Sequence, residues 1–229
     1  MNRSALVFGA TGLVGSHVLN GLLADPAYAA VTTLGRRPLG RTHAKLTHHV
    51  IDFDEPAQYA PLVRADDVFC CLGTTMRQAG SKEAFRRVDY GYVVDAAKNA
   101  SANGAEQFLL VSALGADAGS PFFYNRVKGE AEAAVRTLPF YGVYLARPSL
   151  LRGDRAETRA GEQAADAVLN AVSFLLRGPL RRFRPIEGAT VASALIALAK
   201  QRPGGVQVYE PEALRDAAHR EGERRTQGN

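Results

Sequence analysis

The feature that most constrains this chain is a glycine-rich turn close to its start. The apolar run Ser4 to Phe8 leads directly into the segment GATGLVG and then into an amphipathic stretch that extends to Ala24. A turn that joins a strand to a helix in this way lets backbone N–H groups approach a pyrophosphate, whose charge the helix dipole favours. The alternative is a tight strand-to-helix turn without a ligand. The residues predicted to hold a dinucleotide are Gly9, Thr11, Gly12, Leu13, Val14 and Gly15.

Beyond this turn, short β-branched or aromatic runs alternate with longer helical stretches up to about residue 150. This alternation is typical of βαβ units and of a parallel sheet. The pattern predicts an α/β fold, a Rossmann-like doubly wound parallel sheet with a small C-terminal lid. The expected strands lie at 4–8, 31–34, 46–51, 68–72, 108–112 and 143–146, and the expected helices at 12–24, 81–103 and 123–137.

The pattern changes after Pro148, and the rest of the chain is expected to pack on the same domain. We predict a single NAD(P)-binding domain over 1–229, with a nucleotide-binding core at 1–150 and substrate or lid elements at 151–219. The elements expected there are helices at 164–176 and 190–200, a strand at 206–209 and a last helix. Residues 220–229, REGERRTQGN, are expected to form a flexible tail.

Two arginines follow the second expected strand, where the choice of cofactor is usually decided. An enzyme that uses NAD places Asp or Glu about 20 residues after the glycine turn to bind the ribose 2′-hydroxyl. Here the segment reads LGRR, and the guanidinium groups of Arg36 and Arg37 suit a 2′-phosphate instead. NADP(H) is therefore favoured over NAD(H). Asp52 and Phe53, after the third expected strand, are predicted to meet the adenine ring.

Three further residues suggest proton-transfer chemistry. Ser112 ends the fifth expected strand, and Tyr124 and Lys128 lie four positions apart on the next expected helix, so that they share a face. An unperturbed tyrosine has a pKa near 10, too high for a base at neutral pH, and an adjacent ammonium favours the phenolate. A serine hydroxyl at the strand end can donate a hydrogen bond to the same substrate oxygen. Ser112, Tyr124 and Lys128 are therefore the predicted catalytic residues.

The glycine turn, the strand-end serine and the YxxxK spacing together resemble the short-chain dehydrogenase/reductase superfamily. The segments FCCLGTT, RVDYGYV, YNRVKGEAEA and ARPSLLRGDR are similar, more narrowly, to its atypical Tat-interacting-protein-like NAD(P)-binding oxidoreductase branch. The resemblance runs from about residue 4 to at least residue 160. It implies a Rossmann fold that binds NADPH, with Tyr124 as the acid/base and Lys128 also holding the nicotinamide ribose.

The resemblance also implies further cofactor contacts and one departure. Better-known relatives carry a fourth catalytic residue, an asparagine, on the helix after the fourth strand, and the matching position here is Asp89. This departure puts the usual proton relay to solvent in question. The resemblance places residues 72–74 beside the cofactor and residues 147–150 at its nicotinamide end. The residues concerned are Leu72, Gly73, Thr74, Arg147, Pro148, Ser149 and Leu150.

Composition and charge set bounds on the partners. The net charge is +5, but the 28 basic residues are interspersed with 23 acidic ones, which argues against nucleic acid as a partner. No apolar run approaches the roughly 20 residues that a membrane span needs. His43, His48 and His49 lack acidic or cysteine ligands at metal-binding spacing, and no metal site is predicted. Two adjacent cysteines cannot form a disulfide framework, so a cytoplasmic location is expected.

Three functions are compatible with these patterns. The first is an NADPH-dependent oxidoreductase of the short-chain dehydrogenase/reductase type that acts on a small carbonyl or hydroxyl compound. The second is an NADP(H)-binding regulatory or redox-sensing protein with little turnover, suggested by the missing asparagine and the small lid. The third is a nucleotide-sugar epimerase or dehydratase, which usually requires a larger C-terminal domain and an acidic residue after the second strand. A small-molecule substrate is the expected partner, and a homodimer or a protein partner stays open.

Overall fold

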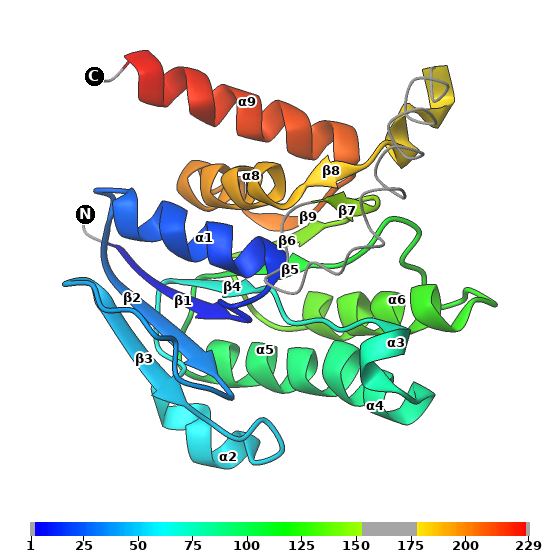
Figure 1. Ribbon diagram of the computed structural model, residues 1–229, viewed down its shortest axis with the longest axis horizontal. Coiled ribbons are helices and arrows are strands. Elements are labelled where there is room, and N and C mark those ends of the chain that lie inside the picture. Colours follow the sequence, from blue (N-terminus) through cyan, green and yellow to red (C-terminus); the bar gives the residue numbers. More distant parts are fainter. Residues whose placement is uncertain (1–2, 153–177, 228–229) are drawn as a thin grey trace.

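The computed structural model describes residues 3–152 and 178–227 of the chain. Its main sheet has seven parallel strands in the order β3-β2-β1-β4-β5-β6-β9 (Figure 1). A second, two-stranded sheet pairs β7 (Leu151–Arg152) with β8 (Ile186–Glu187). The strands of the main sheet are β1 (Arg3–Phe8), β2 (Tyr28–Gly35), β3 (Leu46–Val50), β4 (Asp67–Cys70), β5 (Gln107–Val111), β6 (Gly142–Ala146) and β9 (Gly205–Tyr209). The doubly wound parallel sheet predicted from the sequence is confirmed.

Helices cover both faces of this sheet, with α1, α8 and α9 on one side and α2, α5 and α6 on the other (Figure 1). The helices are α1 (Leu13–Ala24), α2 (Pro56–Tyr59), α3 (Met76–Ala79), α4 (Lys82–Arg86), α5 (Val93–Ala102), α6 (Phe123–Arg136), α8 (Gly188–Gln201) and α9 (Pro211–Gln227). Shorter turns are η1 (Ala60–Leu62), the π-helical η2 (Arg87–Tyr92) and the 3₁₀ segment η3 (Gly178–Phe183). Of the helices in these described ranges, none combines the length and apolarity that crossing a membrane requires.

The two layers of helices give two hydrophobic cores, one on each face of the sheet. Alternate residues of a strand point to opposite faces, so β1 contributes Ala5 and Val7 to one core and Leu6 and Phe8 to the other. The first core lies under α1 and α8, and the second lies under α5 and α6. This burial on both faces explains why the strands read as nearly continuous apolar runs.

The long helix expected at 81–103 is present but is not uniform. The chain passes from α4 through the π-helical η2 into α5, and Gly104 then adopts a left-handed conformation with φ of 79°. The predicted end at Asn103-Gly104 is therefore confirmed. A π-helical turn inside an α-helix shifts the side chains that follow, and such turns are common at functional sites.

The C-terminal part of the chain differs most from its sequence prediction. Residues 151–219 were expected to form substrate or lid elements; within this range, β9 extends the main sheet and α8 packs on α1 within the first core. The side-chain amide of Gln107 on β5 donates to the carbonyl oxygen of Ala199 on α8, at 3.0 Å. The helix predicted at 164–176 falls outside the described residues.

The flexible tail expected over 220–229 is also replaced by ordered structure for most of its length. The helix α9 continues to Gln227, because it packs against α8 and is tied to it by a charged group. Lys200 on α8 lies 2.7 Å from Glu221 on α9 and 3.0 Å from Asp25 at the end of α1. Glu221 is buried by this contact.

Candidate active site

The glycine turn lies between β1 and α1, where two backbone segments come very close. Gly9 has φ of 75°, and a Cβ atom there would lie 2.6 Å from the carbonyl oxygen of Cys71 after β4. The N–H of Gly12 donates to the carbonyl oxygen of Gly9, at 2.9 Å, which closes the turn. Gly12 caps α1 without a side-chain hydrogen bond, and Thr11 and Gly12 are exposed. The first turn of α1 therefore presents N–H groups that no side chain caps, a geometry suited to an anion.

Gly15 is needed for a separate reason, which gives a first prediction. A Cβ atom at Gly15 would overlap the backbone carbonyl of Gly9, whereas one at Gly91 in η2 would meet nothing within 4 Å. We expect Gly15→Ala to lower the free energy of unfolding by about 1–3 kcal/mol, because the backbone of the turn must shift. The matched change Gly91→Ala is expected to raise it by up to about 1 kcal/mol. Urea unfolding of both variants checks this, and equal stabilities would contradict the tight packing of the turn.

The residues predicted to contact the adenosine end lie at the same edge of the sheet as this turn. Leu34 of β2 pairs in register with Phe8, so Arg36 and Arg37 emerge beside the turn, and both side chains are exposed. Asp52 is exposed after β3, and its carboxylate accepts the N–H of Asp54 at 2.9 Å.

Phe53 differs from its neighbours because its ring belongs to the second core. It is 4% exposed and stacks on Tyr92 with ring centroids 5.2 Å apart. Phe8 and Tyr59 pack against its other edges. The sequence could not show this, since three of these four aromatic residues come from other elements. An adenine at this position would meet the backbone of residues 52–53 and the Asp52 side chain.

The predicted catalytic residues come from β5 and α6. Ser112 follows β5 and is 5% exposed, and its N–H donates to the carbonyl oxygen of Ala146 at 2.7 Å. Its Oγ has no hydrogen-bond partner among the residues that the structure describes. Tyr124, near the start of α6, is 39% exposed, with its ring 5.4 Å from that of Phe85. Ser112 thus offers a buried hydroxyl without a partner, and Tyr124 an accessible one.

Close packing holds α6 against the loop that follows Ser112. A Cβ atom at Gly129 would overlap the backbone of Asp117, so only glycine permits this approach. The N–H of Asp117 also donates to the carbonyl oxygen of Asn125, at 3.0 Å. These contacts bring the first turns of α6 to the carboxyl end of β5.

Lys128 lies one turn after Tyr124 and is buried in an ion pair with Asp89. Its Nζ is 2.7 Å from Asp89 Oδ1, and both side chains are almost fully buried. Burial acts to lower the pKa of Lys128, but the charge of Asp89 and the proximity of Tyr124 outweigh it, and the pKa of Lys128 is raised. The ammonium is therefore held in its charged form beside Tyr124.

Asp89 connects this ion pair to the loop after β4. Its Oδ2 accepts the N–H of Thr74 at 2.9 Å, and a Cβ atom at Gly73 would lie 3.3 Å from Oδ1. Asp89 projects from the π-helical η2, which explains how a residue on the helix after β4 reaches this loop. The carboxylate thus contacts two predicted site residues, Lys128 and Thr74.

Residues 147–150 make several hydrogen bonds to other parts of the protein. The guanidinium of Arg147 makes two hydrogen bonds to Glu132 on α6, at 2.9 and 2.6 Å, and so faces the helix. The carbonyl oxygen of Pro148 accepts the N–H of Leu114 at 2.9 Å. Ser149 donates to the carbonyl oxygen of Arg184 at 2.5 Å, and Leu150 is exposed.

Glu132 is a residue that the sequence reasoning missed. It is 2% exposed, and its bond to Arg147 helps to fix α6 relative to β6. Its position four residues after Lys128, in the run GEAEA, was a local signal that it shares that face of the helix. Its partner lies on another element, and no local pattern identifies it.

The chain is similar in sequence to proteins from mammals and fungi. It is 42% identical over 168 residues to Protein HTATIP2 of Rattus norvegicus, covering 72% of this chain and 69% of the rat protein. It is 32% identical over 209 residues to Protein FMP52, mitochondrial, of Candida albicans, covering 88% of this chain and 90% of the fungal protein.

The expected cytoplasmic location is wrong by this comparison. Several fungal relatives are named as mitochondrial, which points away from the cytoplasm. The lack of a disulfide framework distinguishes this chain from disulfide-bonded secreted proteins. It does not distinguish the cytoplasm from other compartments where disulfides are rare, so the cysteines alone could not fix the location.

The chain also resembles solved structures in fold, and it matches a family model. The structure of MoeE5 in complex with UDP-glucose and NAD superposes with a TM-score of 0.67 at 18% identity, covering 90% of this chain and 75% of MoeE5, which shows a shared fold. The family model described as NAD(P)H-binding matches residues 9–166, which include the glycine turn, Ser112, Tyr124 and Lys128. The chain therefore belongs to the NAD(P)H-binding family and, within it, to the atypical branch of the short-chain dehydrogenase/reductases.

Proposed function

We propose that this protein is an NADPH-dependent oxidoreductase that interconverts a small carbonyl compound and the corresponding alcohol. In this proposal the turn 9–15 holds the pyrophosphate, and Arg36 and Arg37 bind the 2′-phosphate. Asp52 meets the adenine, and Leu72, Gly73 and Thr74 lie along the cofactor. The backbone of Arg147, Pro148, Ser149 and Leu150 meets the nicotinamide end, since the Arg147 side chain is held by Glu132.

The shape of the glycine turn supports a bound dinucleotide. Any side chain at Gly9 would meet the backbone of Cys71, and the open first turn of α1 presents N–H groups without a side-chain cap. Both properties are what close approach of a pyrophosphate requires. The nicotinamide, when bound, supplies or accepts the hydride at its C4 atom.

The reaction assigns one role to each of three side chains. Tyr124 exchanges a proton with the substrate oxygen, and the buried ammonium of Lys128 stabilises the phenolate that remains. Ser112 donates a hydrogen bond to the same oxygen and so polarises the carbonyl. Asp89 keeps Lys128 charged and fixed, and it acts as a positioning residue.

The observation that carries this proposal is that the Oγ of Ser112 has no hydrogen-bond partner in the described part of the chain. A buried hydroxyl without a hydrogen bond is costly, at about 1–3 kcal/mol, and is expected where a ligand completes it. Ser112 lies at the carboxyl edge of the sheet, directly after β5, and Tyr124 and Lys128 lie on the next helix, α6. A substrate oxygen bound there satisfies it.

The decisive test is a calorimetric titration of NADPH, NADP⁺ and NADH, because the chain has no tryptophan to report binding by fluorescence. Tight binding of NADPH and weak binding of NADH are expected, followed by NADPH oxidation with one member of a panel of small aldehydes and ketones. Absence of binding by all three would contradict the proposal. A large difference between NADPH and NADP⁺ without turnover would favour the regulatory alternative instead.

The preference for NADPH gives a second prediction. Replacing Arg36 with Asp and Arg37 with Ile removes both guanidinium groups from the end of β2. NADPH binding should weaken at least about 10-fold, equivalent to ~1.4 kcal/mol, while NADH binding changes little. Calorimetry on the double variant measures both constants. An unchanged preference would show that these residues do not read the 2′-phosphate.

The epimerase alternative has weaker support. The solved structures with nucleotide sugars are 15–19% identical to this chain, a similarity that extends to the fold alone. The end of β2 carries arginines where an acidic residue is expected for NAD. Incubation with UDP-glucose and NAD, followed by chromatography of the sugar nucleotide, tests it directly.

A further inference from the structure

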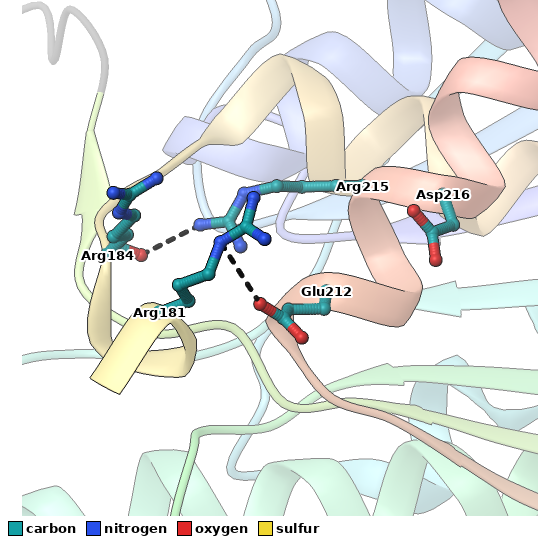
Figure 2. Close-up of a pocket in the computed structure, with 5 residues that line it drawn as sticks. All are labelled: Arg181, Arg184, Glu212, Arg215 and Asp216. Atoms are coloured by element: carbon teal, nitrogen blue, oxygen red, sulfur yellow. Dashed lines mark hydrogen bonds and ion pairs between the residues drawn. The ribbon is translucent and has the colours of Figure 1, made fainter. Parts of the chain in front are cut away.

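A cavity of about 310 Å³ lies beyond the site described above, between η3 and the start of α9 (Figure 2). In the sequence, the segment 177–184 is the densest cluster of arginines. The lining residues are Arg181, Arg184, Glu212, Arg215 and Asp216.

Two arginines of this cavity differ in how firmly they are held: hydrogen bonds anchor Arg215, whereas Arg181 makes only a long ion pair. Figure 2 shows the side chains of Arg181 and Arg215 converging beside Glu212. Nη2 of Arg215 donates to the carbonyl oxygens of Arg184 and Pro185, at 2.9 and 3.3 Å. Nε of Arg181 is 3.8 Å from Glu212, a long ion pair between two exposed side chains. Arg215 thus keeps further N–H groups for a ligand, and Arg181 is only loosely engaged.

The balance of charge in this cavity favours an anion. Three arginines and two acidic residues line it. The pKa of Arg215 is lowered, mainly because the guanidinium is partly buried. The charge of Glu212 opposes this lowering, whereas the charges of Arg184 and Arg181 increase it. A bound oxyanion would relieve the repulsion among the cations and accept the paired N–H groups that a guanidinium offers.

The cavity also lies at the same edge of the sheet as Ser112. Residues 147–150 follow β6 and α9 follows β9, and both strands are parallel to β5, which ends before Ser112. Two hydrogen bonds connect the loop after Ser112, through residues 147–150, to the cavity. The N–H of Leu114 donates to Pro148, and the hydroxyl of Ser149 donates to the carbonyl oxygen of Arg184.

We propose that this cavity, which we call the arginine pocket (Arg181, Arg184 and Arg215 with Glu212 and Asp216), binds a carboxylate or phosphate group of the ligand. Its role as the non-reacting end of the substrate rests on the proposed function. The substrate is then an anionic carbonyl or hydroxyl compound. Its charged end lies in the arginine pocket and its reacting oxygen lies at Ser112 and Tyr124.

The test uses NMR spectra of the arginine Nε–Hε groups in the full chain, recorded after addition of NADPH. NADPH binding is followed by the shifts of the amide signals of the glycine turn. If these signals do not shift, the proposed function fails, and the arginine signals still report whether an anion binds. Inorganic phosphate and acetate are then titrated separately. Saturable shifts of Arg181 and Arg215 are expected, and the anion that gives the larger affinity identifies the class, phosphate ester or carboxylate.

Three variants that each change one charge make the test specific. Arg181→Gln should weaken the binding of the preferred anion about 10-fold. Glu212→Gln should strengthen it about 3-fold, because it removes a competing carboxylate. Arg64→Gln, an exposed arginine at the opposite edge of the sheet, should change nothing. Opposite effects at positions 181 and 212 cannot come from misfolding. Shifts that do not saturate, or variants that all behave alike, would overturn the proposal.

Discussion

Tyr124→Phe is expected to lower kcat by about 10²- to 10⁴-fold, the contribution typical of a positioned general acid or base. The change removes only the hydroxyl that exchanges a proton with the substrate. The ring remains beside Phe85, so the binding constant for NADPH should stay within about twofold. The measurements are steady-state NADPH oxidation with the best carbonyl substrate and a calorimetric titration of NADPH.

Tyr141→Phe provides the matched control for this change. Tyr141 is also exposed, and it lies just before β6, at the edge of the sheet opposite Ser112. Its hydroxyl donates a hydrogen bond to the carbonyl oxygen of Arg202, at the end of α8. Turnover of this variant should equal that of the unaltered chain. If Tyr124→Phe keeps full activity, Tyr124 is not the acid/base, and the mechanism proposed above is wrong.

Asp89→Ala is expected to lower the free energy of unfolding by about 3–5 kcal/mol, the usual cost of removing one partner of a buried ion pair. Lys128 would then be buried without a counter-charge, and the N–H of Thr74 would lose its acceptor. Asp89→Asn keeps an oxygen for that N–H and should cost less. Urea unfolding at neutral pH measures both, with Asp95→Ala on α5 as a control, for which a smaller loss is expected.

The pH dependence of this effect has a definite sign. The pKa of Lys128 is raised in the folded state, so its stabilising contribution is fully present below the ordinary lysine pKa of about 10.4. It is lost as the pH rises through the higher folded value. In Asp89→Ala the burial that Asp89 outweighs is left to lower the pKa of Lys128, so the variant loses the cost of the unpaired charge as the pH rises. The difference between the unaltered chain and Asp89→Ala should therefore shrink from neutral to alkaline solution, and a difference that grows over that range would contradict this account.

Much of the fold could be predicted because its signals are local. The glycine turn follows directly from β1, and β1, β4, β5 and β6 are short, largely apolar runs. Their parallel order follows from the alternation with helices. The predicted positions of Ser112, Tyr124 and Lys128 relied on spacing within one strand end and one helix, and the structure has Ser112 directly after β5 and the other two on α6.

What could not be predicted depends on contacts between distant segments. The sequence shows Glu132 and Arg147 as two charges 15 residues apart, and nothing local indicates that they form a buried pair. The exposed side chains of β9 gave no sign that this strand joins the sheet at β6. The arginine pocket likewise combines η3 with the first turns of α9, about 30 residues later.

The contribution of α8 and β9 to the main sheet also affects how the protein is made. The helix α1 is among the first segments to be synthesised, yet the helix that covers it spans Gly188–Gln201. Until those residues leave the ribosome, the apolar face of α1 and the open edge of β6 remain exposed to other chains. Contacts so distant in sequence also slow folding. Nascent chains that stop near residue 150 should therefore aggregate or recruit chaperones, although the whole glycine turn and the catalytic residues have already been translated.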